Sequence, residues 1–116
     1  MLDYAKGNKG NKKMNKRRLG ILLSTPPQHP NLKTTIRLAE AALSQQVDVY
    51  LYLVDDGVYA LNNDQLVGLA QQGVKLFACA YGAQRRGIPV SDKANFCGLV
   101  VFSDLVKGCD RFIALN

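Results

Sequence analysis

Cys79 is the residue of this sequence best placed for nucleophilic chemistry. It ends the apolar run 74–79, which is typical of a strand, and it precedes a segment that predicts a short helix at 80–86. Backbone N–H groups at the start of a helix stabilise a thiolate, the nucleophilic form of cysteine. Arg85 and Arg86 add positive charge nearby. The alternative is a cysteine that packs as a small apolar side chain, as most free cysteines do.

Two other cysteines and the single histidine are weaker candidates. Cys97 lies near the start of another predicted helix and is a possible second thiol, although packing against that helix is the favoured explanation. Cys109 begins an apolar segment, where we expect a structural role. His29, in the proline-rich loop 25–30, could serve as a base for Cys79, or it could simply be solvated. With no third residue to orient this pair, a hydrolytic triad is not supported.

The sequence favours neither a metal site nor a cofactor site. Asp55 and Asp56 could hold a metal or a ribose, but paired acids at a turn more often cap it, and a third hard ligand is missing. The spacing of the cysteines does not match a zinc site. The prolines after the first apolar run lack the N–H donors that bind phosphate, and neither common phosphate-loop motif follows that run. We therefore expect no cofactor, and a flavin-type redox domain is the weakest function class.

The candidate residues fall at the ends of alternating strands and helices. Strands are predicted at 19–24, 47–54, 74–79 and 109–115, and helices at 31–43, from 62 or 63 to 73, at 80–86 and at 95–107, the last with Leu99 and Val106 facing inward. This alternation predicts a single α/β domain, a three-layer sandwich with a mainly parallel sheet.

Ligands of open parallel sheets bind beyond the carboxyl ends of the strands. If the strand order is flavodoxin-like, the crevice lies between the first and third strands. Its walls would be the segments 25–31, 55–59 and 79–86.

The charge of the chain is concentrated at one end. The net charge of +6 lies entirely in residues 1–18, whereas residues 19–116 have eight Lys and Arg and eight Asp and Glu. We expect 1–18 to be a disordered basic leader that could touch RNA or an acidic partner, with no specific nucleic-acid role. No apolar run is long enough to span a membrane and the first residues do not resemble a secretion signal, so we expect a cytoplasmic protein.

Several segments together resemble the DsrE/DsrF-like sulfur-relay proteins. They are the Thr-Pro-Pro loop after the first strand, LAEAAL in the first helix, DGVY at 56–59, CAYGAQRRG at 79–87 and GCDRFI at 108–113. The resemblance covers residues 19–116 and implies a flavodoxin-like sheet and homo-oligomeric rings, trimers or hexamers. It also implies that Cys79 accepts sulfane sulfur as a persulfide. Possible supporting residues are Arg85, Arg86, His29, Asp56 and Tyr59.

Two functions remain open at this stage. One is a small cytoplasmic sulfur carrier, a possible sulfurtransferase, that exchanges sulfur with donor and acceptor proteins and needs no cofactor. The other is an oligomeric binding or scaffold module in which Cys79 is inert. Tyr50 and Tyr52 alternate on a strand that could be partly exposed, which also favours a homo-oligomer.

Overall fold

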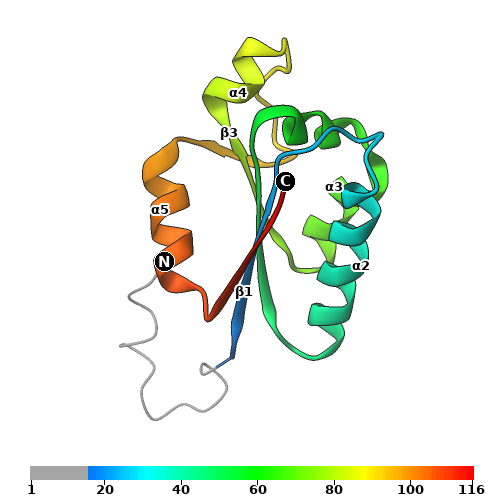
Figure 1. The fold of residues 1–116 in the computed structure, drawn as a ribbon, viewed down its shortest axis with the longest axis vertical. Helices are drawn as coiled ribbons and strands as arrows, with labels where there is room; N and C mark the ends of the chain where they lie inside the picture. The colour runs from blue at the N-terminus through cyan, green and yellow to red at the C-terminus, as the bar shows by residue number, and fades with distance from the viewer. Residues whose placement is uncertain (1–15) are drawn as a thin grey trace.

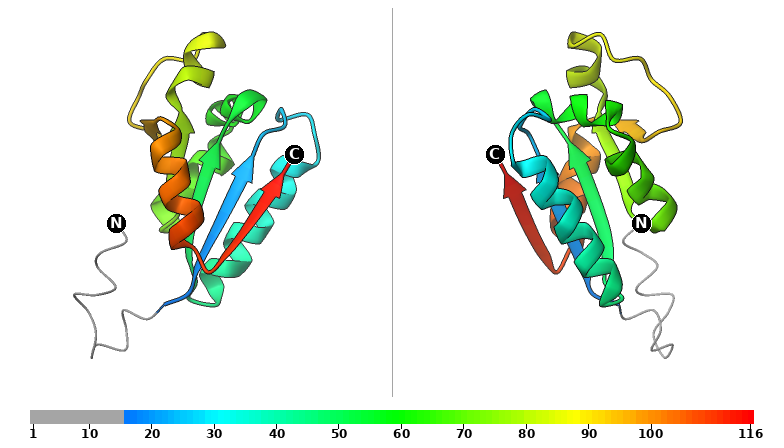
Figure 2. Two further views of the ribbon diagram at one scale, coloured as in Figure 1. Left: turned by 60° about the vertical axis from the view of Figure 1, so that its left-hand side comes forward. Right: turned by 90° about the vertical axis from the view of Figure 1, so that its right-hand side faces the viewer.

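A five-stranded parallel sheet forms the centre of the protein in a computed structural model that describes residues 16–116. Every neighbouring pair of strands is parallel (Figure 2). The strands are β1 (Arg18–Leu23), β2 (Asp48–Leu53), β3 (Lys75–Cys79), β4 (Asn95–Cys97) and β5 (Arg111–Leu115), in the order β4-β3-β2-β1-β5.

Helices cover both faces of this sheet. The α-helices are α2 (Asn31–Ser44), α3 (Asp64–Gly68), α4 (Ala80–Arg85) and α5 (Leu99–Gly108), and the 3-10 helices are η2 (Asp55–Asn62) and η3 (Leu69–Gln72). One face carries α2 and α3 and the other carries α5, whereas α4 stands beyond the carboxyl ends of the strands (Figures 1 and 2). The predicted three-layer α/β sandwich with a parallel sheet is thus confirmed.

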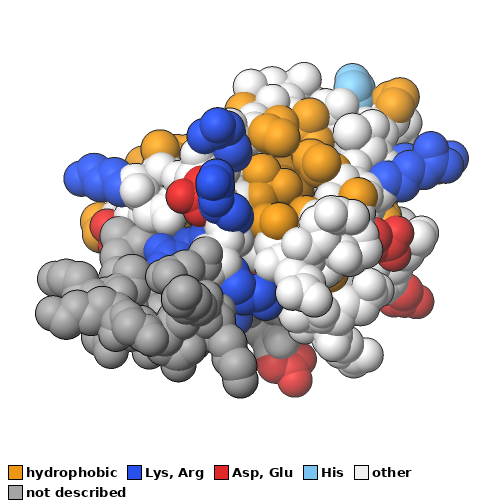
Figure 3. Space-filling model, turned by 90° about the horizontal axis from the view of Figure 1, so that it is seen from below, with side chains coloured by type: hydrophobic (Ala, Val, Ile, Leu, Met, Phe, Trp, Pro, Cys, Tyr) orange, Lys and Arg blue, Asp and Glu red, His pale blue; other side chains and the backbone are white. Residues whose placement is uncertain are grey.

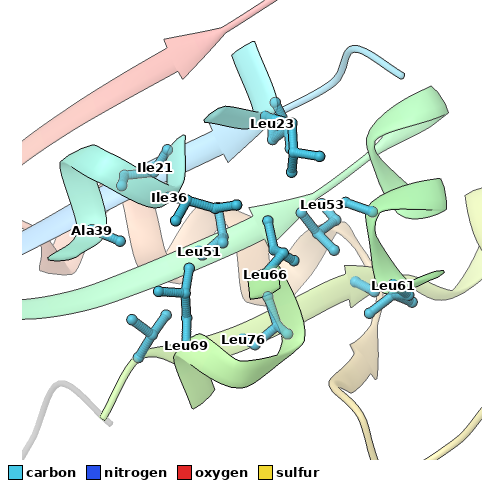
Figure 4. Close-up of a cluster of buried hydrophobic side chains, with 14 of the residues drawn as sticks. Ile21, Leu23, Ile36, Ala39, Leu51, Leu53, Leu61, Leu66, Leu69 and Leu76 are labelled. Carbon is cyan, nitrogen blue, oxygen red and sulfur yellow. The ribbon is translucent and has the colours of Figure 1, made fainter. Parts of the chain in front are cut away.

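The larger core lies between the sheet and the α2–α3 face. Ile21 of β1 and Leu51 of β2 are fully buried there, together with Leu66 of α3. The labelled side chains from the strands and from α2 and α3 point toward one another (Figure 4). Burial of these apolar side chains is the main contribution that holds this layer on the sheet.

The smaller core lies under α5 and is rich in aromatic side chains. Tyr52 is fully buried, and its ring meets that of Phe102 edge to face at a centroid distance of 5.3 Å. Tyr50, at 6% exposure, faces this core too, so the expectation that these tyrosines lie on a partly exposed strand is wrong. Of the helices in the described residues, only α5 covers this face (Figure 2), and its outer side is left open. Leu99 and Val106 are 73% and 43% exposed, so the prediction that they face inward is also wrong.

The strand order changes where a crevice can form. β2 lies between β1 and β3, so the first and third strands are not neighbours and the crevice expected between them does not exist. The order instead reverses at β1, whose second neighbour is β5. A hydrophobic pattern identifies strands but carries little information on which strand joins which.

The segment predicted as the start of the last helix forms a strand. Asn95–Cys97 is β4, and α5 begins only at Leu99 after Gly98, whose backbone is extended. Pairing with the free edge of β3 provides hydrogen bonds for this short segment that a helix start would leave unmade. This additional strand, β4, brings Cys97 into the sheet beside Cys79.

The folded domain begins slightly earlier than the sequence indicates. β1 starts at Arg18, and Lys16 forms an ion pair with Asp48 at 3.3 Å, so residues 16–18 belong with the domain. The expectation of a disordered leader otherwise falls on residues 1–15, outside the described residues. At the end of the molecule that faces away from α4, Lys and Arg side chains stand among apolar and acidic ones (Figure 3).

Within residues 16–116, no helix is long and apolar enough to cross a membrane.

Candidate functional site

Cys79 lies where β3 ends and α4 begins, and it is the N-cap residue of α4. Its Sγ accepts a hydrogen bond from the backbone N–H of Gly82 at 3.3 Å. This hydrogen bond fixes the position of the sulfur, and because the side chain is only half-buried, the sulfur stays accessible to reactants. The prediction that Cys79 precedes helical N–H groups is confirmed.

An open cavity of about 400 Å³ lies against Cys79. It forms beyond the carboxyl end of β3, where a parallel sheet places its ligands. Two of the three predicted wall segments, 55–59 and 79–86, meet here. The lining residues are Asp55, Cys79, Tyr81, Gly82, Arg85 and Arg86.

The Arg86 side chain connects α4 to η2 through hydrogen bonds. Its Nε donates to Asp56 Oδ1 at 2.9 Å and its Nη1 donates to the carbonyl oxygen of Gly82 at 3.2 Å. The Arg86 side chain is 24% exposed and that of Asp56 is 51% exposed, so solvent weakens the pair to about 1 kcal/mol or less. Its effect is therefore to orient α4 over the cavity rather than to stabilise the fold.

Arg85 and Tyr81 form the outer rim of the cavity. Arg85 Nη1 donates to the Tyr81 hydroxyl oxygen at 3.0 Å, and the guanidinium carbon lies 5.7 Å from the centre of the Tyr81 ring. These two contacts restrict the orientation of both side chains, although Tyr81 is 65% exposed. A positive charge is thus kept at the entrance to the cavity.

Cys97 is the direct neighbour of Cys79 across the sheet. The two residues are register partners in the parallel pair of β3 and β4, and both pack against the smaller core. Burial raises the pKa of Cys97; a hydrogen bond with Tyr52 lowers it and the proximity of Cys79 raises it, both by less than burial does. The Cys97 thiol is therefore protonated at neutral pH.

Tyr52 belongs to the core against which both cysteines pack. Its hydroxyl donates to the carbonyl oxygen of Gly98 at 3.1 Å, next to Cys97. Burial is the main cause that raises the pKa of Tyr52 well above its ordinary value of 10.0, and the neighbouring Cys97 and Cys79 raise it further. The phenol stays protonated and acts as a hydrogen-bond donor at the ends of the strands.

His29 and Tyr59 are not among the residues that line the cavity of Cys79. His29 lines a separate cavity of about 550 Å³ beside α2, and its Nδ1 accepts a hydrogen bond from the N–H of Asn31 at 3.0 Å. Tyr59 is half-buried within η2. The structure therefore does not bring the hypothetical base to the thiol.

Cys109 lies away from β3, at the C-terminal end of α5 rather than at the start of a strand. It is half-buried, and burial raises its pKa despite the nearby positive charge of Arg18. Within residues 16–116, no group of three or more His, Cys, Asp and Glu side chains is placed to hold a metal ion.

Sequence reasoning missed three features of the site. Asp55, which was expected in a wall of the crevice, lines the cavity with a left-handed backbone (φ of 50°), a conformation that aspartate tolerates better than most residues and that the sequence did not indicate. Tyr52 was expected on a strand that could be partly exposed, whereas it is fully buried beside the cysteines. The pairing of Cys79 with Cys97 depended on a three-residue strand that no apolar pattern marks.

Tyr52→Phe is expected to lower the free energy of unfolding by about 1 kcal/mol at neutral pH, because the hydrogen bond to Gly98 is lost. The raised pKa of Tyr52 adds stability that is fully present below pH 10 and is lost as the pH rises further, since only the unfolded chain then ionises this residue. The variant should therefore lose less stability than the wild type in that range. Urea unfolding on both sides of pH 10 measures the difference, with Tyr81→Phe as the matched control. Equal alkaline losses in the wild type and Tyr52→Phe would contradict the assignment.

Comparison with known proteins agrees with this geometry. The model of the DsrE/DsrF-like family matches residues 17–115. The chain belongs to the DsrE/DsrF-like family. This confirms the resemblance drawn from the sequence motifs, over nearly the same residues.

Two solved structures share the fold of this DsrE/DsrF-like chain. The YchN protein of E. coli has a TM-score of 0.74 at 22% sequence identity, over 86% of this chain and 99% of that one. BT1422 of Bacteroides thetaiotaomicron, a conserved protein of unknown function, has a TM-score of 0.72 at 13% identity, over 84% of this chain and 94% of that one. The chain matches none of the curated protein sequences with which it was compared.

Proposed function

We propose that this protein is a sulfur carrier that holds sulfane sulfur as a persulfide on Cys79. The observation that carries the proposal is the position of the thiol, which is half-exposed, fixed by the Gly82 N–H at 3.3 Å and open to the cavity beyond β3. Membership of the DsrE/DsrF-like family supports a sulfur-relay role.

The reaction requires one thiolate and one accessible sulfur. The Cys79 thiolate attacks the outer sulfur of a donor persulfide R–S–SH; the S–S bond of the donor breaks, RS⁻ leaves, and Cys79–S–SH remains. An acceptor thiolate later removes the outer sulfur in the same way. No electrons enter or leave, so neither a metal nor an organic cofactor is needed, and the rate depends on thiolate fraction, nucleophilicity and access.

The arginines have supporting roles in this proposal. Arg86, fixed by Asp56, keeps α4 over the cavity, and Arg85 keeps a positive charge at the entrance. A persulfide is an anion once its outer sulfur is deprotonated, so this charge favours the loaded state. The donor and acceptor are proteins that present a cysteine persulfide and a cysteine thiol, in a reducing compartment such as the cytoplasm.

Loading is tested by incubating the full chain with glutathione persulfide and measuring its intact mass at early times. The proposal predicts a gain of about 32 Da, one sulfur atom, that dithiothreitol removes. Incubation with glutathione disulfide is the control, because it supplies a mixed disulfide but no sulfane sulfur. A chain that takes up no sulfur would leave the scaffold function in its place.

We also expect a homo-oligomer, a trimer or hexamer. The outer surface of α5 exposes large apolar residues, with Leu99 at 73% and Val100 at 77% exposure, and Tyr81 of α4 is 65% exposed. Light scattering at micromolar concentration should give a multiple of the 12.7 kDa chain mass. Replacement of Val100 by Asp should shift the mass toward the monomer. A wild-type protein of monomeric mass would contradict the expectation.

A further inference from the structure

We infer that Cys97 is the resolving thiol of this site: it attacks sulfur-loaded Cys79, closes a Cys79–Cys97 disulfide and expels the cargo as sulfide. The inference rests on the proposed function, because it concerns the fate of the persulfide on Cys79. It starts from the register of β3 and β4, in which Cys79 and Cys97 are direct partners.

The register brings the two residues within covalent reach. Neighbouring strands lie about 4.8 Å apart, and the Cα atoms of disulfide-bonded cysteines are separated by about 4.4–6.8 Å. Partners in a parallel pair also present their side chains to the same face, and both cysteines pack against the same core, beside Tyr52. Each is half-buried and neither is already bonded.

The step balances without an outside oxidant. The Cys97 thiolate attacks Sγ of the persulfide Cys79–S–SH, an Sγ–Sγ bond forms, the bond to the outer sulfur breaks, and HS⁻ leaves. The outer sulfur is reduced to sulfide while the Cys97 sulfur is oxidised to the disulfide level, and the oxidation level of the Cys79 sulfur does not change. An external dithiol then restores both thiols by exchange.

The burial of Cys97 determines whether transfer to an acceptor or resolution by Cys97 comes first. Since burial raises the pKa of Cys97, its thiolate fraction is small at neutral pH. A loaded Cys79 then has time to meet an acceptor before resolution removes the sulfur. Cys97 thus acts on sulfur that no acceptor has collected, and it returns the site to a form that a dithiol can reset.

The test follows the loaded protein over time after excess glutathione persulfide is removed. In the wild type, the gain of about 32 Da should give way to a species about 2 Da lighter than the reduced chain, with one sulfide released per chain. In Cys97→Ser, the loaded form should last about tenfold longer or more. Cys109→Ser is the matched control, because it removes another half-buried cysteine, and it should behave as the wild type does.

Mapping of the tryptic peptides locates the disulfide. Cleavage after Lys and Arg places Cys79 on peptide 76–85 and Cys97 on peptide 94–107, so a disulfide links these two peptides. A non-reducing gel should show that the link lies within one chain. Cys97→Ala gives a second variant should serine disturb the fold, and circular dichroism checks both.

Three results would overturn the inference. The loaded wild type could last as long as Cys97→Ser, the sulfur could move to Cys97 without release of sulfide, or sulfide could leave without a disulfide. Failure of the proposed function looks different, because Cys97→Ser and Cys109→Ser would then take up no sulfur at all. That result would remove both proposals together.

Discussion

Cys79→Ser is expected to abolish sulfur uptake, with loading from glutathione persulfide slowed by at least about a hundredfold, because an alcohol is a far weaker nucleophile than a thiolate at neutral pH. The fold should persist. Serine fills nearly the same volume, the position is half-buried, and its hydroxyl can accept the hydrogen bond of the Gly82 N–H that the sulfur accepts now. Intact mass measures the uptake and thermal unfolding checks the fold.

Cys109→Ser provides the comparison for this result. Cys109 is also half-buried, but it lies at the end of α5, away from the cavity, and should leave loading unchanged. If Cys79→Ser still takes up one sulfur and Cys97→Ser does not, the carrier cysteine is Cys97. If no single replacement changes uptake, the sulfur is not carried at one built site, and the scaffold function becomes the better account.

Gly57→Ala is expected to lower the free energy of unfolding by about 2–3 kcal/mol, because the added methyl group has no room. At Gly57 a Cβ atom would overlap the backbone carbonyl group of Leu23, where η2 crosses the end of β1. The overlapping atoms of Leu23 belong to the backbone of β1, which cannot move away as a flexible side chain can. Since η2 carries Asp55 and Asp56, its displacement should also loosen α4 and slow the reaction of Cys79 with thiol probes.

Gly68→Ala separates this clash from the general effect of adding a methyl group. Nothing lies within 4 Å of the Cβ position at Gly68, and its helical backbone suits alanine. This change should leave the protein equally stable or stabilise it by about 0.5–1 kcal/mol. Urea unfolding compares the two variants. Equal stabilities for Gly57→Ala and Gly68→Ala would show that η2 is not held against β1 in this way.

The predicted elements succeeded where the chain gives strong local signals. The buried strands around Ile21 and Leu51 are continuous apolar runs, and Gly73 ends η3 with a φ of 115°, as expected of a glycine just past a helix. The prediction failed where pairing partners decide the structure. Asn95–Cys97 is a strand because the edge of β3 lies beside it, and three residues carry no periodicity that could reveal this.

The same distinction between local signals and pairing partners explains which parts of the site could be predicted. Cys79 and its helical cap follow from local signals, namely a strand end, a glycine and a short helix. The contact between Arg86 and Asp56 joins residues 30 positions apart, and the pairing of Cys79 with Cys97 depends on sheet register. Such contacts depend on the strand order. A flavodoxin-like order, which the family resemblance implied, would have placed the crevice between the first and third strands.

The location of the sulfur tests the central claim most directly. Wild-type protein is loaded with glutathione persulfide, quenched early by alkylation and digested with trypsin, which separates the cysteines into peptides 76–85, 94–107 and 108–111. Mass spectrometry then reads the extra sulfur, about 32 Da, on each peptide. The carrier account predicts it on 76–85, the peptide of Cys79, and not on 108–111. Extra sulfur spread evenly over the three peptides, or found on none, would contradict it.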